Sequence, residues 1–186
     1  MNHMHIPDGI LPVWLWVSGL VLMSLALAFS LYRLRDMDKK KRVPLLGAIS
    51  GVMLVAMNLE LVPIAYHINL SVIAGILLGP ALGFVAAFIV NLMLALIGHG
   101  GITVIGLNTL LLGAEMALGH TFFMLMKDSL PVFWRSASVT ALSLFITTLL
   151  MISIVALSGA NPEVFSRSHD HGHGYEAVFS DRKSVV

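Results

Sequence analysis

The sequence has no cysteine and few charged side chains. Without thiols the chain can form no disulfide, thiolate zinc site or iron–sulfur cluster. A transition metal would therefore need nitrogen or oxygen ligands, and the chain has eight histidines. Charged residues make up 11% and apolar residues 58% of the 186 positions, whereas soluble domains carry about 25% charged residues. These proportions exclude a soluble fold and predict helices solvated by lipid.

Other absences narrow the function. The net charge is only +1, so no broad positive field favours nucleic acid as a partner. The sequence contains no Walker A phosphate loop and no H-E-x-x-H pair, and we therefore expect neither an ATPase nor a metal-dependent enzyme. The segment Met1 to Ile10 lacks Lys and Arg and contains Pro7 and Gly9, so we expect no cleavable signal peptide.

Long apolar runs predict a single all-α, polytopic transmembrane bundle of about six helices. The first run, Leu11 to Tyr32, can cross a hydrocarbon core of about 30 Å. A longer stretch, residues 69–97, is interrupted by Gly79 and Pro80, a pair that ends one helix and opens another. The predicted helices cover residues 11–32, 43–62, 69–79, 80–97, 102–126 and 136–157.

Basic residues predict the orientation in the membrane. The loop after the first run holds Arg33, Arg35, Lys39, Lys40, Lys41 and Arg42. Short basic loops belong on the cytoplasmic side, which places the N-terminus, His67, His99 and the C-terminus outside. We expect one helical domain, residues 1–157, with an N-terminal metal-binding segment, residues 1–10. The tail, residues 158–186, is polar and His-rich, and its composition cannot bury a core.

The N-terminus has the donors for a metal site. The candidate N-terminal ligands are Met1, Asn2 and His3, or Met4 and His5. A free α-amine, the next peptide nitrogens and a nearby imidazole can hold Ni(II) or Cu(II) in a plane. A start at Met1 would supply four nitrogens, whereas a start at Met4 would supply three and leave one place for His67. The alternative for the N-terminal segment is a polar terminus without a function, and the alternative for His67 is an interfacial histidine that binds no metal.

Several polar residues fall within the apolar runs. Glu60 could orient a ligand imidazole or be an interfacial carboxylate. Asn108 and Glu115 are expected to form hydrogen bonds between helices, and the same default applies to Asn91 and His120.

Gly47 and Gly51 form a small-xxx-small pair, which allows another helix to approach closely. Packing within the bundle is the preferred interpretation of this pair from the residues alone, with a partner protein as the alternative.

Three blocks resemble the CbiM/NikM family, the cobalt and nickel substrate-capture components of energy-coupling-factor transporters. The first block is Met4 to Leu11 (MHIPDGIL). The second is His67 followed by residues 76–80 (ILLGP), and the third is residues 98–103 (GHGGIT) with residues 106–108 (GLN). Together they span about two thirds of the chain, and the combination is more specific than any block alone.

The resemblance implies capture of Ni²⁺ or Co²⁺ at the outer face of a prokaryotic plasma membrane. The ligands would be the amine of Met4, the next backbone nitrogen, the His5 imidazole and His67, while His99 and Asn108 would line or brace the pocket.

By the same resemblance, Gly47 and Gly51 would meet a transmembrane coupling protein. ATP would be hydrolysed by separate subunits, with a small accessory membrane subunit as a further partner. The rival interpretations are a self-sufficient metal permease, which needs ligands along the whole path, and a structural membrane subunit without metal.

Overall fold

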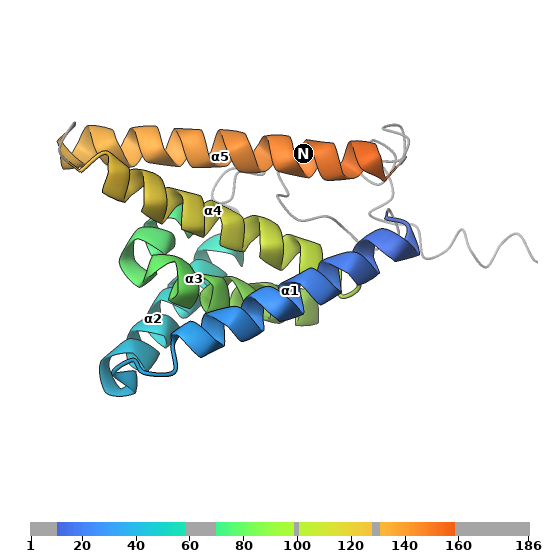
Figure 1. Cartoon of the computed structure of the whole chain (residues 1–186), viewed down its shortest axis with the longest axis horizontal. Helices are drawn as coiled ribbons and strands as arrows, with labels where there is room; N and C mark the ends of the chain where they lie inside the picture. Colours follow the sequence, from blue (N-terminus) through green and yellow to red (C-terminus); the bar gives the residue numbers. More distant parts are fainter. Residues whose placement is uncertain (1–10, 59–69, 99–100, 128–130, 159–186) are drawn as a thin grey trace, which may run out of the picture.

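Five helices make up the part of the chain that the computed structural model describes, residues 11–58, 70–98, 101–127 and 131–158. They are α1 (Val13–Arg33), α2 (Lys39–Asn58), α3 (Ser71–Leu96), α4 (Ile105–Leu125) and α5 (Val132–Leu157) (Figure 1). These residues form no strand, and the prediction of an all-α fold is confirmed for them.

The exterior of the helical bundle is apolar. α1, α3 and α5 are each long and apolar enough to cross a membrane, yet only 17% of that apolar stretch is buried in α1 and in α5. The side chains of Leu25, Phe29 and Phe145 are 63%, 60% and 63% exposed. Water would not tolerate so much exposed apolar surface, whereas lipid solvates it. The chain is therefore a multi-pass membrane protein.

The predicted count of six spanning helices is not confirmed. The two helices expected on either side of Gly79 belong to one element, α3, which departs from helical geometry at that residue. The limb before the bend, residues 71–78, is about 12 Å long at 1.5 Å per residue. This limb is too short to cross a core of about 30 Å. The outer position of the N-terminus stays a prediction.

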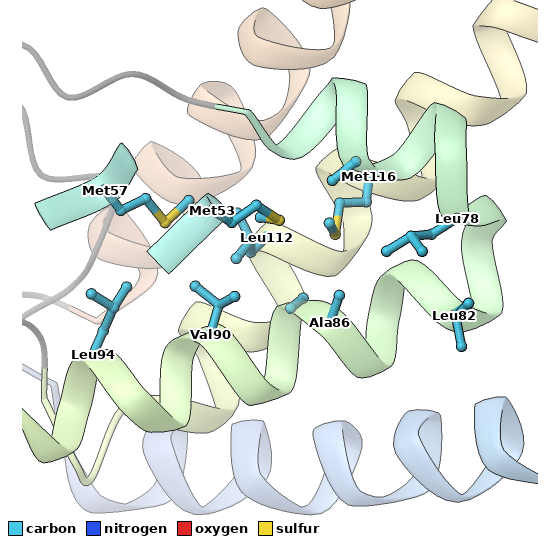
Figure 2. Packing of buried hydrophobic residues seen from close by; sticks show 11 residues of the cluster. Met53, Met57, Leu78, Leu82, Ala86, Val90, Leu94, Leu112 and Met116 are labelled. Atoms are coloured by element: carbon cyan, nitrogen blue, oxygen red, sulfur yellow. The ribbon is translucent and has the colours of Figure 1, made fainter. Parts of the chain in front are cut away.

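The predicted break at Gly79 is confirmed. Its φ of 76° and ψ of 173° lie in a region that is almost restricted to glycine. Pro80 follows, because proline fits the first turn of a helix, where its missing N–H is not needed. Figure 2 shows the limb that carries Leu78 turning into the limb that carries Leu82.

Small residues let α3 pack against itself and against α4. A Cβ built on Gly83 would lie 3.8 Å from the Cα of Gly75, so the two limbs of α3 are in contact. A Cβ on Gly75 would lie only 2.7 Å from the Cα of Met116 in α4. A larger residue would push the two backbones apart, and this contact between α3 and α4 is the most extensive in the bundle.

The main apolar core fills the space between α2, α3 and α4. Its members include Met53 and Met57 of α2, Leu78 and Leu94 of α3, and Met116 of α4 (Figure 2). α4 also contacts α1 and α5, and most of its residues are buried. α3 contacts all four other helices, so α3 and α4 together form the centre of the described bundle.

Two helices begin earlier than predicted. α2 starts at Lys39 instead of residue 43, since lysine and arginine are good helix formers and a basic run does not end a helix. α5 starts at Val132 instead of residue 136, directly after the extended Pro131. Arg135 is consequently part of α5, where its guanidinium lies 3.7 Å from the centroid of the Phe123 ring.

The bend supplies a test of the fold. Replacing Gly79 by alanine places a Cβ in a backbone region that other residues avoid, at a cost of about 1–3 kcal/mol. We expect Gly79→Ala to lower the melting temperature of the detergent-purified chain. The matched control is Gly47→Ala, since Gly47 lies inside α2 with open space around it. Alanine there should leave the melting temperature unchanged or raise it slightly. Equal melting temperatures for the two variants would contradict the strained bend.

Candidate metal site and its surroundings

Most of the predicted site residues lie outside the described residues. They are Met1, Asn2, His3, Met4, His5, Glu60, His67 and His99. Their proposed roles stay predictions. Asn108 is the one predicted pocket residue that the structure describes. The structure also describes the residues that flank the segments 1–10, 59–69 and 99–100.

Residues of two of the three sequence blocks, the first and the third, lie together. Leu11, which directly follows the segment of residues 1–10, is 8% exposed and packs in one cluster with Val104, Leu107 and Leu111. Val104 comes four residues after the undescribed pair 99–100. Both blocks are therefore anchored at the same end of α4.

The segment 59–69, which contains His67 of the second block, begins near this place. Met57, two residues before the segment 59–69, lines a small cavity of about 30 Å³ together with Asn108 of α4 and Met151 of α5. A cavity of this size has room for water. The ends of α2 and α5 and the beginning of α4 thus meet at Asn108, which is 4% exposed.

The wall of the cavity contains further polar groups. Glu115 is 2% exposed and Thr147 is 4% exposed, and both line the cavity with Thr148. The sequence analysis missed the two threonines of α5. A Thr-Thr pair inside an apolar run was the available signal, because hydroxyl groups within a membrane helix need hydrogen-bond partners. Thr147 finds one in its own helix, where it donates to the Ser143 carbonyl at 2.9 Å.

Glu115 joins α4 to the beginning of α3. The hydroxyl of Ser71, the first residue of α3, donates a hydrogen bond to Oε1 of Glu115, and Ser71 is fully buried. The prediction that Glu115 bonds between helices is confirmed. Asn91 instead donates a hydrogen bond from Nδ2 to the Ala87 carbonyl of its own helix at 3.0 Å.

The described residues do not form a metal site by themselves. Within residues 11–58, 70–98, 101–127 and 131–158, no three His, Asp or Glu side chains are grouped so that they could hold an ion. His120 is on α4 but lines a different cavity, which is wide and open, together with the bend of α3. The ligand set predicted from the sequence thus depends on residues outside these ranges.

Comparison with known proteins decides the family. A family model described as the cobalt uptake substrate-specific transmembrane region, CbiM, matches residues 5–177. The chain belongs to the CbiM family. As a CbiM-type protein it is a membrane component of cobalt or nickel transport.

Individual relatives agree with this assignment. A Methanosarcina barkeri protein named as a cobalt transport protein CbiM is 32% identical over 168 residues, which cover 86% of this chain and 73% of the relative. A Haloquadratum walsbyi protein named as a metal transport protein is 33% identical, with coverage of 67% and 60%. An Archaeoglobus fulgidus protein named as a fused nickel transport protein NikMN is 37% identical, with coverage of 56% and 36%.

The small-residue pair on α2 of this CbiM-family chain faces away from the rest of the bundle. Gly47 and Gly51 are exposed, and no described residue lies within 4 Å of a Cβ built on either. Val52 and Val55 beside them are 59% and 57% exposed. The preferred interpretation of the sequence, packing within the bundle, is therefore wrong for the described residues. The close contacts are made instead by other glycines, such as Gly75.

The Ser71 hydrogen bond supplies a test of the polar interior of the CbiM-type bundle. Ser71→Ala removes one hydrogen-bond donor from the buried Glu115 side chain, and a hydrogen bond of this kind contributes about 0.5–1.5 kcal/mol. We expect a lower melting temperature in detergent. The control is Ser136→Ala, whose exposed hydroxyl bonds only to its own helix, at the Val132 carbonyl. An unchanged melting temperature for Ser71→Ala would show that this bond adds nothing to stability.

Proposed function

We propose that the chain is the substrate-specific component of an energy-coupling-factor transporter, which captures Ni²⁺ or Co²⁺ at the extracytoplasmic face for ATP-driven uptake. The observation that carries the proposal is the convergence of described residues next to the segments 1–10, 59–69 and 99–100, which hold the candidate ligands: Leu11 and Val104 lie in one cluster, and Met57 and Asn108 lie around one cavity. Segments that leave one place on a rigid bundle can supply ligands to one ion. The family description and the cobalt and nickel in the relatives' names support the choice of cargo.

The proposed ligands are nitrogens. With Met4 as the terminus, its amine, the next backbone nitrogen and the His5 imidazole hold the ion, and His67 completes the set. With Met1 as the terminus, Met1, Asn2 and His3 take that part. Nitrogen ligands in a plane suit Ni²⁺ and replace the hydration shell that keeps a dication out of lipid. These nitrogens must lose protons to bind, so affinity falls as the pH falls.

Residues around the ligands would fix the shape of the metal site and the orientation of its imidazoles. His99 and Asn108 would line or brace the pocket, and Glu60 would accept a hydrogen bond from a ligand imidazole, which fixes the orientation of the ring. Asn108 is suited to this part because it is buried and lines a cavity inside the bundle instead of facing lipid.

The rest of the machinery would be separate. The exposed face of α2 around Gly47 and Gly51 would bind a transmembrane coupling protein. A small accessory membrane subunit and separate ATP-binding subunits would complete the complex in the plasma membrane. The open space at both glycines supports this surface, since a partner helix can approach closely there. The chain itself would bind and release metal without catalysing a reaction.

The metal site is tested by binding. Titration of the detergent-purified chain with Ni²⁺, with intact mass used to establish the terminus, should give one site per chain. Loss of an outer-shell partner already costs about 10–100-fold in metal affinity, so His5→Ala and His67→Ala should each cost more than about 100-fold. His120→Ala serves as the control, because His120 lies at the other end of α4. Unchanged affinity in both ligand variants would contradict the site.

The coupling surface is tested separately. The double variant Gly47→Leu/Gly51→Leu should bind Ni²⁺ with the affinity of the wild type but fail to co-purify with the coupling protein, because leucine keeps a partner helix away. Ala28→Leu adds similar bulk at an exposed position of α1 and should not disturb the complex. Metal uptake into liposomes by the isolated chain would contradict the dependence on partners and favour a self-sufficient permease.

A further inference from the structure

The end of the bundle opposite the candidate metal site contains a second, much larger cavity. It is an open cleft of about 630 Å³, formed by the C-terminal end of α1, the beginning of α2, the bend of α3 and the C-terminal part of α4. Figure 1 shows the end of α1 and the beginning of α2 at this end of the bundle. A cleft of this volume is large enough for a small organic ligand.

The polar groups of the cleft are basic. Arg33 of α1, Arg42 of α2 and His120 of α4 line it, and no Asp or Glu is among the described residues that do so. The guanidinium of Arg33 lies over the ring of Phe29, 5.4 Å from the centroid, so this side chain is held along the wall. Nδ1 of His120 is buried without a hydrogen-bond partner among the described residues.

The nearby carboxylates are engaged elsewhere. Asp36 lies 3.5 Å from Arg35 in an exposed ion pair. Asp38 precedes α2 and accepts a hydrogen bond from the backbone N–H of Lys40 at 3.2 Å. The first turn of α2 holds no acid but a run of four basic residues, residues 39–42. Cations at a helix N-terminus are unfavourable because they add to the positive end of its dipole, and an anion relieves this.

We propose that the cleft binds the headgroup of an anionic phospholipid. The phosphate would be held by Arg33 and Arg42, and His120 would donate a hydrogen bond or leave its Nδ1 to a headgroup hydroxyl. Basic pockets between membrane helices recognise lipid headgroups by this chemistry.

The apolar parts of the cleft favour a lipid over free phosphate. Phe29 and Leu77, which line it, are 60% and 58% exposed, on two helices that are apolar enough to span a membrane. Acyl chains can cover these side chains while the headgroup stays with the arginines. A bound lipid would then join α1, α2, α3 and α4, whose direct contacts at this end leave the cleft open.

The test compares lipids on the full-length chain. The chain in neutral detergent is titrated with phosphatidylglycerol, with phosphatidylcholine and with inorganic phosphate, and bound lipid is counted by native mass spectrometry. Phosphatidylglycerol should bind at one site, phosphatidylcholine weakly, and phosphate should compete only at far higher concentration. The variant Arg33→Gln/Arg42→Gln should weaken the phosphatidylglycerol site at least about tenfold. Both arginines are exposed, so the variant should elute like the wild type on size exclusion.

The matched control also removes two positive charges from the stretch of residues 33–42. Arg35 and Lys40 do not line the cleft, so Arg35→Gln/Lys40→Gln should retain the site. Equal weakening by both double variants would overturn the proposal in favour of unspecific attraction to basic residues. Equal binding of the two lipids would overturn the headgroup contact, and full competition by dilute phosphate would leave a phosphate site instead of a lipid site.

Discussion

The close approach of α3 and α4 is the contact on which the other features of the bundle depend. Gly75 lets the first limb of α3 approach the α4 backbone at Met116 so closely that a Cβ on Gly75 would clash with it. The limb can reach this place only because Gly79 adopts a backbone conformation that reverses the chain. In lipid the hydrophobic effect does not drive membrane helices together. The stabilising free energy has to come from van der Waals contact between closely spaced backbones.

This arrangement places polar groups inside the bundle. Other helices cover α4 on several sides, and its Asn108 and Glu115 are buried inside the bundle. Polar side chains cost less free energy there than on a surface that faces lipid. Ser71 can bond to Glu115 because the short first limb of α3 begins beside α4. A small cavity lined by Asn108, Glu115 and Thr147 among apolar side chains lies at the end of the bundle where the segments 1–10, 59–69 and 99–100 join the described helices. The opposite end has a wide cleft lined by Arg33, Arg42 and His120.

The sequence predicted the helical class and the bend well, because long apolar runs and a Gly-Pro pair act locally. Glu115 was also predictable, since a carboxylate within an apolar run needs an internal partner. Helix beginnings were less accurate, as at Lys39, because the charges that set topology do not stop a helix. The sequence could not tell which small residues pack inside the bundle: Gly75 and Gly47 look alike in sequence, and only the fold of α3 distinguishes them. The position of Thr147 and Thr148 in the cavity wall was not predictable, because it depends on how α5 packs against α4. The predicted metal ligands lie outside the described residues.

X-ray absorption at the nickel edge of the Ni²⁺-loaded chain tests the central claim most directly, because it reports the donor atoms and their arrangement. The account predicts four nitrogen donors in a plane, with the outer-shell scattering that imidazole rings produce. Six oxygen donors in octahedral geometry, without imidazole scattering, would contradict a site built from the N-terminal segment and His67.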